Sequence, residues 1–377
     1  MKYYIIAGEA SGDLHASNLM KAMLKNDAST QFRFWGGDRM AAVAGQPVKH
    51  IKDLAFMGFI EVISNLKTIL SNIKLCKNDI LNYKPDALIL IDYPGFNLRI
   101  AEFAKENNIP VHYYISPQVW AWKQNRVHKI KKIVDQMYCI LPFEKEFYKR
   151  FDIDVHYVGH PLVDAIQEFR LNALTHENFL QHHKLESKKI LAMLPGSRKQ
   201  EIKIKLPIML EAAKSFSDHQ ILIAGAPNIS LEFYKTIAGS SKIHVIQNDT
   251  YNLLNNSDLA MVTSGTATLE TALFKVPEVV CYKGSSISYQ IAKRLIKVKY
   301  ISLVNLIMDQ LVVTELIQND LTPKNIIREL KLLEDSNSPA RQKLKETYTE
   351  LEKKLGGGGA SDHVAKLILN FSNQEKS

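Results

Sequence analysis

Short runs of apolar residues alternate with longer amphipathic stretches along the whole chain. The apolar runs predict strands at residues 3–7, 31–35, 87–91, 111–115, 136–141 and 155–158, and again at 190–194, 219–224, 243–246, 259–262 and 278–282. The stretches between them carry apolar residues at helical spacing, as in 16–25, 100–107, 206–216 and 266–274. Continuous apolar strands that alternate with helices are typical of parallel sheets covered on both faces. The pattern therefore predicts an α/β fold of the doubly wound kind.

The alternation of strands and helices starts again near residue 188, after a stretch rich in His, Glu, Asn and Lys. A chain of 377 residues is also long enough for two domains. We expect two doubly wound, Rossmann-like domains whose parallel sheets face each other across a cleft, with ligands at the carboxyl ends of the strands. The predicted parts are an N-terminal domain at 1–165, a linker at 166–187, a C-terminal domain at 188–338, and C-terminal helices with a tail at 339–377.

The charge balance narrows the classes of partner. A formal net charge of +9 favours an anionic partner, such as a nucleic acid, a phosphorylated substrate or an acidic membrane surface. Nucleic acid is the weakest of these, because the chain lacks an arginine-rich tract, zinc-ligand spacing and an RNA-binding signature. Three isolated cysteines fit a reducing compartment. Because the apolar start is too short for a signal peptide and no apolar run approaches a membrane span, we expect a cytoplasmic protein with peripheral membrane contact.

The most informative motif follows the predicted strand at 259–262. Ser264-Gly265-Thr266 would turn the chain into a helix that carries Glu270 one turn in. Unbonded N–H groups and the positive end of the helix dipole favour a phosphate at such a turn. A carboxylate can accept hydrogen bonds from the two hydroxyls of a ribose. The motif predicts a site for a nucleoside diphosphate; the alternative is an ordinary threonine cap with a glutamate in the first turn.

A second motif, Gly196-Ser197-Arg198, follows the first predicted strand of the second half. Its glycine and serine can present N–H groups, and its guanidinium can bind a diphosphate. The alternative is a solvated basic helix start. A cation is unfavourable at that end of the helix dipole, which favours a bound anion.

Acidic residues follow two predicted strands of the first half. Glu9, Ser11, Gly12 and Asp13 come after the first strand, where small residues let a ligand approach the backbone, although a plain tight turn is the alternative. Asp92 comes after the strand at 87–91. A carboxylate among apolar neighbours can have a raised pKa and act as a base, whereas the alternative is an Asx turn ahead of Pro94.

Aromatic and apolar residues suggest further contacts. Trp120 and Trp122 share one loop and could wall a sugar or acyl pocket, or form a buried lid on the core. His160 could orient groups in the cleft, although a single histidine is more often structural. Residues 54–75 carry apolar side chains at helical spacing. A core-facing stripe is the default, and the alternative is an acyl-chain or membrane contact through Phe56, Met57, Phe59, Ile60 and Ile63.

Taken together, these motifs resemble those of the lipid-A-disaccharide synthase family, inverting glycosyltransferases of the GT-B fold. The matching segments run in the family's order and cover most of the chain: Gly8–Asp13, Met57–Val62, Asp92–Asn97, Ser116–Trp122, Pro142–Glu144, Gly159–Pro161, Leu194–Arg198, Thr263–Glu270 and Tyr300–Asn305. The resemblance implies that the chain joins UDP-2,3-diacylglucosamine to 2,3-diacylglucosamine 1-phosphate. The products would be a β-1,6-linked disaccharide 1-phosphate and UDP, formed on the cytoplasmic face of the Gram-negative inner membrane.

The resemblance also implies a role for each candidate residue. UDP is expected at Gly196, Ser197, Arg198, Ser264, Gly265, Thr266 and Glu270, and the acylated sugars at Ser11, Gly12, Asn97, Ser116, Trp120, Trp122 and Asn305. Asp92 is the expected base, with Glu9, Asp13 and His160 as competing candidates. Arg198 and backbone dipoles are expected to stabilise the leaving UDP, so that neither a metal ion nor a cofactor is required.

The chain departs from the family's motifs at two positions, and three alternative functions remain open. Gly95 stands where the family usually has a second acid, which leaves Asp92 as the motif's carboxylate, and Val304 stands where a proline is common. A UDP-sugar 2-epimerase shares the architecture but needs no lipid-facing surface. A non-enzymatic nucleotide-sugar sensor would bind UDP without turnover, and another lipid-linked N-acetylglucosaminyltransferase is the nearest alternative. An oligomer is compatible with all of these.

Overall fold

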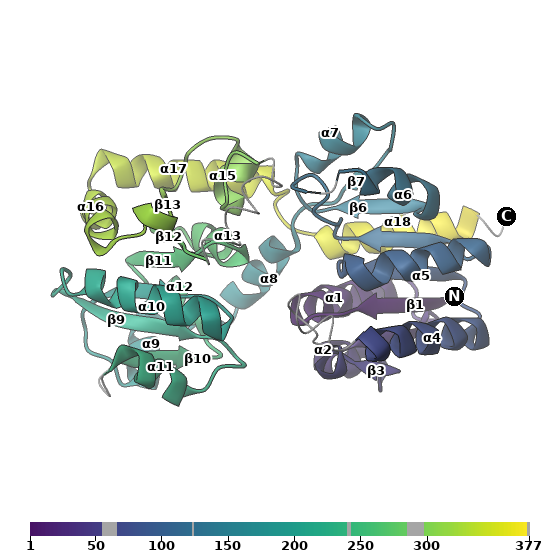
Figure 1. Cartoon of the computed structure of the whole chain (residues 1–377), viewed down its shortest axis with the longest axis horizontal. Helices are drawn as coiled ribbons and strands as arrows, with labels where there is room; N and C mark the ends of the chain where they lie inside the picture. Colours follow the sequence, from purple (N-terminus) through teal and green to yellow (C-terminus); the bar gives the residue numbers. More distant parts are fainter. Residues whose placement is uncertain (55–65, 123, 240–242, 285–297, 375–377) are drawn as a thin grey trace. The chain divides into compact units, whose positions relative to one another are not determined.

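The computed structural model describes residues 1–54, 66–122, 124–239, 243–284 and 298–374. The chain forms two compact units, Met1–Asp164 with Leu355–Ser377, and Ala165–Lys354. Each unit consists of a parallel β-sheet with helices on both faces (Figure 1). The predicted α/β fold is therefore confirmed. No helix among the described residues combines the length and the apolar character needed to cross a bilayer.

The first unit contains a seven-stranded sheet in the order β3-β2-β1-β4-β5-β6-β7. The strands are β1 (Lys2–Ala7), β2 (Gln31–Gly36), β3 (Lys49–His50), β4 (Ala87–Ile91), β5 (Val111–Tyr114), β6 (Gln136–Cys139) and β7 (His156–Tyr157). The helices are α1 (Ala10–Asn26), α2 (Asp38–Ala44), α4 (Leu66–Tyr83), α5 (Pro94–Glu106), α6 (Arg126–Ile133), α7 (Glu144–Lys149) and α18 (Ala360–Gln374), with a short 3₁₀ turn η1 (Ile51–Asp53). The central strands β1 and β4 are buried over almost their whole length, as their continuous apolar runs predict.

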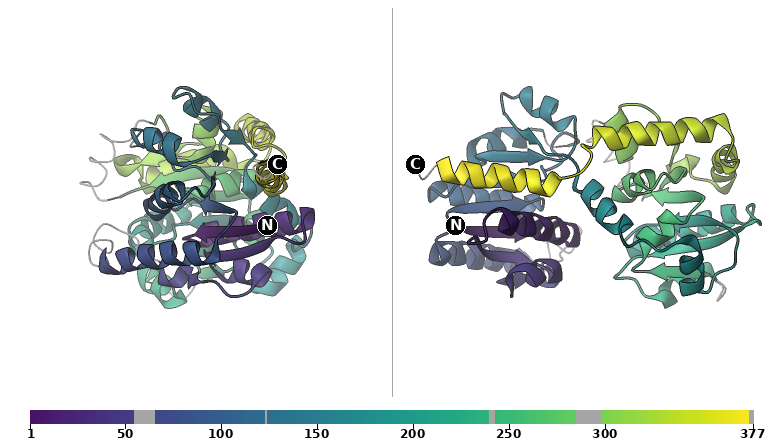
Figure 2. Two further views of the ribbon diagram at one scale, coloured as in Figure 1. Left: turned by 90° about the vertical axis from the view of Figure 1, so that its right-hand side faces the viewer. Right: turned by 180° about the vertical axis from the view of Figure 1, so that it is seen from behind.

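The last helix of the chain returns to the first unit. Val364, Ala365 and Ile368 of α18 are fully buried in one core cluster with Leu19 and Met23 of α1. Figure 2 shows α18 in yellow next to α1 in purple, at opposite ends of the sequence. The C-terminal helices predicted as one part at 339–377 thus fall into different units.

The second unit contains a six-stranded sheet in the order β10-β9-β8-β11-β12-β13. The strands are β8 (Lys189–Leu194), β9 (His219–Gly225), β10 (His244–Gln247), β11 (Leu259–Thr263), β12 (Glu278–Tyr282) and β13 (Glu315–Ile317). The helices are α9 (His176–His183), α10 (Lys199–Ala213), α11 (Leu231–Ala238), α12 (Thr250–Asn255), α13 (Thr266–Leu273), α15 (Leu303–Met308), α16 (Pro323–Glu334) and α17 (Pro339–Lys354), with a 3₁₀ turn η2 (Gln318–Asp320). Helix α8 (Pro161–Arg170) carries the chain from one unit into the other.

The segment predicted as a linker at 166–187 holds the end of α8 and the whole of α9. Phe179 of α9 is fully buried in a core cluster with Ile190 and Ala192 of β8. The segment therefore packs as part of the second unit. Its polar composition reflects the exposed face of a short helix.

The two sheets share one strand order, which fixes where ligands can bind. In the first sheet β1 pairs with β4, with Ala7 opposite Ile91. In the second sheet β8 pairs with β11, with Leu194 opposite Val262. On one side of each central pair the following strands add toward one edge of the sheet, and on the other side they add toward the opposite edge. Such a topological switch point opens a crevice at the carboxyl ends of the strands.

Candidate functional site

The turns after β1 and β4 meet at the switch point of the first sheet. Glu9 follows β1 and Asp92 follows β4, and the strand register brings their turns side by side. A Cβ atom at Gly8 would lie 2.3 Å from Cγ of Tyr93, so the Tyr93 ring lies directly on the glycine backbone. Of the four predicted acid–base candidates, Glu9 and Asp92 are brought close enough to influence each other's charge.

The Asp92 turn has a left-handed backbone at two successive residues. Asp92 has a φ of 43° and Tyr93 a φ of 50°, a conformation that costs about 1–3 kcal/mol for each non-glycine residue. The turn is held by two donors to the Asp92 carbonyl, Asn97 Nδ2 at 2.7 Å and Tyr113 Oη at 2.6 Å. Asn97 is fully buried. Its side chain therefore supports the turn from beneath and does not present its amide to a substrate.

The carboxyl group of Asp92 is well suited to accept a proton. Burial, followed by the negative charge of Glu9, raises its pKa to about 6 in all, against the opposing effect of a hydrogen bond from the Tyr93 N–H. A carboxylate with this pKa is ionised at neutral pH and is more basic than an exposed aspartate. General bases work best when their pKa lies near the working pH.

Asp13 is occupied by structural hydrogen bonds. Helix α1 begins at Ala10, so Ser11, Gly12 and Asp13 lie in its first turns rather than in a loop. The buried carboxylate of Asp13 accepts from the N–H groups of Gly37 at 2.7 Å, Arg39 at 3.1 Å and Met40 at 3.1 Å. These are the orphan donors at the start of α2, so Asp13 acts as a distant cap.

Ser11 and Gly12 differ in exposure. Ser11 is exposed at the first turn of α1, whereas Gly12 is buried. A Cβ at Gly12 would lie 3.3 Å from Cβ of Ala7, so this glycine lets α1 pack closely on β1. Only Ser11 of the two has a side chain that can reach a ligand.

His160 is a buried, neutral imidazole. Burial, with a smaller contribution from the neighbouring His15, lowers its pKa to about 3. His15 itself is buried, which lowers its pKa to about 4. Nδ1 of His160 accepts from the Leu162 N–H at 3.2 Å, which assigns the ring proton to Nε2. His160 can donate a hydrogen bond but does not carry positive charge at neutral pH.

The loop after β5 presents one of its two tryptophans. Ser116 is buried and lies 2.7 Å from Tyr148 Oη. Trp120 is also buried, and its ring meets the Phe143 ring edge-on at 5.0 Å. Trp122 is 43% exposed, with the Arg126 guanidinium 5.8 Å from its ring centre. The alternative of a buried lid therefore describes Trp120, whereas ligand contact by Trp122 stays a prediction.

Glu144 is a buried acid to which the sequence patterns gave no role. It accepts from the Leu141 N–H at 2.9 Å and from Ser116. Burial raises its pKa to about 7, and these hydrogen bonds oppose the rise. The carboxyl group ties the loops after β5 and β6 together. The motif Pro142–Glu144 was the one signal that pointed to it.

The turns after β8 and β11 meet at the switch point of the second sheet. Gly265 caps α13 with a φ of 147°, and Gly265 and Thr266 are exposed there. Ser264 Oγ donates to the Ile301 carbonyl at 2.8 Å, which fixes the turn. Thr263 Oγ1 is buried with no hydrogen-bond partner among the described residues. The first residues of α13 are thus exposed, and a phosphate at this helix start stays a prediction.

The turn after β8 and the start of α10 carry a compact cluster of charged side chains. Gly196 has a φ of 125°, and a Cβ there would lie 2.5 Å from Oε2 of Glu201. Glu201 also lies 3.7 Å from Arg198 Nη1 and 3.9 Å from Lys205 Nζ. The Lys205 side chain is only 2% exposed, and its burial lowers its pKa. Glu201 and Lys205 were missed because in sequence they resemble any solvated charge pair on a helix.

Glu270 lies one turn into α13, as predicted. It is half-buried and accepts from Tyr251 Oη at 3.2 Å. Burial raises its pKa, and the Tyr251 hydrogen bond opposes the rise. The tyrosine orients the carboxyl group on the same side of the sheet edge as the α13 turn.

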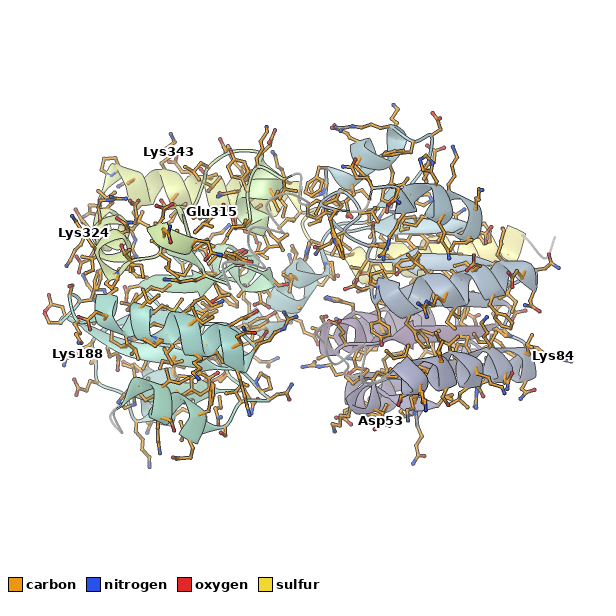
Figure 3. The ribbon with its side chains drawn as sticks, viewed as in Figure 1. Asp53, Lys84, Lys188, Glu315, Lys324 and Lys343 are labelled. Carbon is orange, nitrogen blue, oxygen red and sulfur yellow. The ribbon has the colours of Figure 1, made fainter. Side chains whose placement is uncertain are left out.

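Asn305 is a structural residue by its contacts. Its side chain is fully buried, and its Oδ1 accepts from the N–H groups of Val312 at 2.8 Å and Val313 at 2.9 Å. Its Nδ2 donates to Glu315 Oε1 at 2.9 Å, and Glu315 is labelled beside β13 in Figure 3. The side-chain amide of Asn305 therefore holds this loop in place. Because it is buried, it exposes no group that could make the predicted contact with a sugar.

Two further expectations concern membrane contact and metals. Phe56, Met57, Phe59, Ile60 and Ile63 lie outside the described residues. Across the part of the chain that the structure describes, no group of three or more His, Cys, Asp or Glu side chains is arranged to hold a metal ion.

Comparison with known proteins identifies relatives over the whole length. The family model described as lipid-A-disaccharide synthetase matches residues 3–366. A lipid-A-disaccharide synthase of Syntrophus aciditrophicus is 40% identical over 375 residues, which is 97% of each chain. Another from Nitrosococcus oceani is 39% identical over 373 residues, covering 97% of this chain and 95% of that protein.

Solved structures of more distant proteins share the fold. UDP-GlcNAc 2-epimerase of Neisseria meningitidis, bound to UDP-GlcNAc, superposes with a TM-score of 0.64 at 14% identity, covering 98% of this chain and all of that one. The calicheamicin glycosyltransferase CalG4 superposes with a TM-score of 0.61 at 12% identity, covering 100% of this chain and 99% of that one. At these identities the likeness shows the fold alone, which is that of the GT-B glycosyltransferases and the 2-epimerases.

The contacts of Asp13 predict a loss of stability when its carboxylate is removed. Asp13→Ala is expected to lower the free energy of unfolding by about 2–3 kcal/mol, because it leaves the N–H groups at the start of α2 without their acceptor. Denaturant unfolding measures this, with Ser11→Ala, an exposed position on the same helix, as the control. An Asp13→Ala protein of unchanged stability that has lost activity would instead place Asp13 in the catalytic machinery.

Proposed function

The chain belongs to the lipid-A-disaccharide synthase family, and on that premise we propose that it joins UDP-2,3-diacylglucosamine to 2,3-diacylglucosamine 1-phosphate. It is a glycosyltransferase of lipid A synthesis. The observation that carries this conclusion is the match over residues 3–366, at 40% identity to a relative of nearly equal length. The finer assignment of the two acylated sugars rests on the resemblance of the motifs to those of this family.

The direct experiment incubates the purified chain with both acylated sugars. Mass spectrometry should detect one disaccharide 1-phosphate and one UDP for each donor consumed. Omitting the acceptor is the control, and both products should then disappear. A chain that releases UDP but forms no disaccharide would contradict the proposed acceptor.

The epimerase alternative is not favoured by these findings. The epimerases resemble this chain at 14–16% identity, which extends to the fold only. Incubation with UDP-GlcNAc alone separates the two activities, because a 2-epimerase converts it without an acceptor. Conversion of UDP-GlcNAc in that assay would reopen the alternative.

In the proposed donor site, UDP lies at the second unit's switch point. Its diphosphate meets the start of α13 and Arg198, where N–H groups and a forked cation both favour negative charge. Glu270, held by Tyr251, accepts from the ribose hydroxyls. Each contact also stabilises the charge that develops on UDP as it departs.

The proposed reaction is one displacement at the donor's anomeric carbon. The acceptor hydroxyl oxygen forms the new C–O bond while the bond to the UDP oxygen breaks, and UDP leaves with that electron pair. Asp92 takes the proton of the acceptor hydroxyl. Attack opposite to the leaving group inverts the configuration and gives the β-linked product.

Asp92 is the best base among the four candidates. The carboxylate of Asp13 is taken up by backbone N–H groups, and His160 has its Nδ1 occupied and a very low pKa. Glu9 raises the pKa of Asp92 and so increases its basicity. We assign Asp92 as the base and Glu9 as the residue that tunes it.

Asp92→Asn should reduce kcat about 10²–10⁴-fold while UDP binding stays unchanged, because an amide cannot accept the proton. The parent enzyme should lose activity as the pH falls below about 6, where the carboxylate becomes protonated. Initial rates between pH 4.5 and pH 8, at roughly half-unit steps, test this. The residual activity of Asp92→Asn should lack that acidic limb.

A second variant tests the neighbouring position. A Cβ at Gly95 would meet nothing within 4 Å, so Gly95→Asp adds the second acid without a clash. Rescue of Asp92→Asn by Gly95→Asp would show that a carboxylate at either place in the turn suffices. A folded Asp92→Asn protein with parental kcat would show that Asp92 is not the base and would make Glu9 the next candidate.

Glu270→Ala should weaken UDP binding by about 1.5–3 kcal/mol, the usual contribution of hydrogen bonds to a charged group. Titration calorimetry with UDP measures the change. Tyr251→Phe is the matched variant, since it keeps the carboxylate and removes its orienting hydroxyl, and it should have a smaller effect. Parental affinity in folded Glu270→Ala would exclude this residue from the site.

We propose that the leaving UDP is stabilised without a metal ion. The exposed Arg198 side chain and the start of α13 at the proposed donor site support this proposal. Activity should persist in excess EDTA, whereas Arg198→Ala should lower kcat about 10²–10³-fold, the usual effect of losing one charge-stabilising donor. The assay is UDP release with and without chelator. Loss of turnover in EDTA that magnesium restores would contradict this account.

Peripheral attachment to an acidic membrane surface is also proposed, supported by the net charge of +9. Vesicles with anionic lipid should sediment the protein, and added salt should weaken the binding because it screens charge. Replacing Phe56, Met57 and Phe59 with Ser should reduce it further, since each apolar side chain contributes about 1–3 kcal/mol when buried in lipid. Binding that is equal on neutral vesicles, or a triple variant that unfolds, would count against this surface.

A further inference from the structure

Arg126 is a sheltered arginine whose charged group is not used by the fold. Of the arginines that the structure describes, only Arg126 and Arg341 are not exposed. Arg341 donates to backbone carbonyls, those of Asp258, Leu333 and Glu334. Arg126 is half-buried, and no described residue accepts a hydrogen bond from it or pairs with it as an ion. Its guanidinium is therefore available to a ligand.

The position of Arg126 is close to the turn that carries Asp92. Arg126 is the first residue of α6, which packs beside α5, the helix that follows the Asp92 turn (Figure 1). Burial raises the pKa of Tyr113 well above its usual value, and the positive charge of Arg126 opposes that rise. Tyr113 Oη in turn donates to the Asp92 carbonyl at 2.6 Å. The guanidinium thus lies at the same sheet edge as the proposed base.

The surroundings of Arg126 orient it without neutralising it. The Trp122 ring centre lies 5.8 Å from the guanidinium, a cation–π contact that uses none of its N–H donors. The start of α6 is the positive end of the helix dipole, where a cation is unfavourable. The first turn of this helix contains no acidic residue that could offset the charge. A cation kept in such a place favours an anionic partner from outside the protein.

We propose that Arg126 binds the phosphate of the acceptor sugar and so selects a phosphorylated acceptor, an inference that rests on the proposed function. The acceptor carries its reacting hydroxyl and its phosphate on one sugar ring, and Asp92 and Arg126 meet these two groups from one sheet edge. A guanidinium binds two phosphate oxygens at once, which the point charge of a lysine does not match. Arg198 of the second unit is left for the diphosphate of the donor.

The test compares two acceptors, 2,3-diacylglucosamine 1-phosphate and the same sugar without its phosphate. With the phosphorylated acceptor, Arg126→Gln should lower both the binding affinity and kcat/KM about 10–100-fold, mainly through KM, because hydrogen bonds to a charged group are lost. With the unphosphorylated acceptor, the variant and the parent should differ little. Titration calorimetry measures binding, and initial rates at saturating donor measure turnover.

Matched variants separate a phosphate contact from a general change in charge. Arg126→Lys keeps the charge but not the forked geometry, and it should recover part of the lost affinity. Lys132→Gln removes an exposed charge from the same helix and should behave as the parent does with both acceptors. UDP affinity should keep its parental value in each of these proteins.

The binding measurement distinguishes this inference from the proposed reaction. If Arg126 is needed to bind the phosphorylated sugar but the parent forms no disaccharide, the phosphate site stands and the proposed function fails. Equal losses with both acceptors in Arg126→Gln, or parental affinity for the phosphorylated one, would overturn the phosphate site even when disaccharide is formed. Weaker UDP binding with an unchanged preference between the acceptors would also overturn it, because Arg126 would then contact the donor.

Discussion

The burial of the Asp92 carboxylate at the end of β4 is the constraint on which the proposed site of the first unit depends. Parallel strand order places Glu9 at the same sheet edge, so that a second negative charge adds to the effect of burial. Asn97 and Tyr113 donate to the Asp92 carbonyl and hold the residue in a left-handed turn at this edge. The pKa of Asp92 is raised to about 6 by burial first and by the charge of Glu9 second.

The second unit uses the same topology for the opposite charge. Its switch point carries the start of α13 and a cluster of two cations around one acid, where the first unit carries two acids. The fold supplies only the crevice, since strand order is the same in both sheets. The chemistry depends on which side chains follow the central strands. We propose that the acid pair prepares a base in the first unit, and that the helix start with its guanidinium prepares a site for a diphosphate in the second.

The sequence predicted the central strands and their parallel pairing because these strands are apolar on both faces. It missed β3 and β13, which have two and three residues and are too short to show a period. It also missed partners that lie far apart in sequence. Asp13 looked like a cleft residue, yet its hydrogen bonds go to a helix that begins 25 residues later. Asn305 looked like a sugar ligand although its partners lie only 7–10 residues further along the chain, because the sequence pattern did not show the loop and short strand that carry them.

The cluster around Glu201 illustrates how buried charge can serve an exposed site. Glu201 sits over Gly196 and lies near both Arg198 and Lys205, but the two cations differ in exposure, 67% for the Arg198 side chain and 2% for that of Lys205. A buried ammonium without its carboxylate would be costly, so Lys205 and Glu201 stabilise each other. The guanidinium of Arg198 is the more exposed of the two cations. We propose that a diphosphate can attract Arg198 away from Glu201 without leaving the acid unpaired, because Lys205 remains its partner, so that the turn binds an anion at little electrostatic cost.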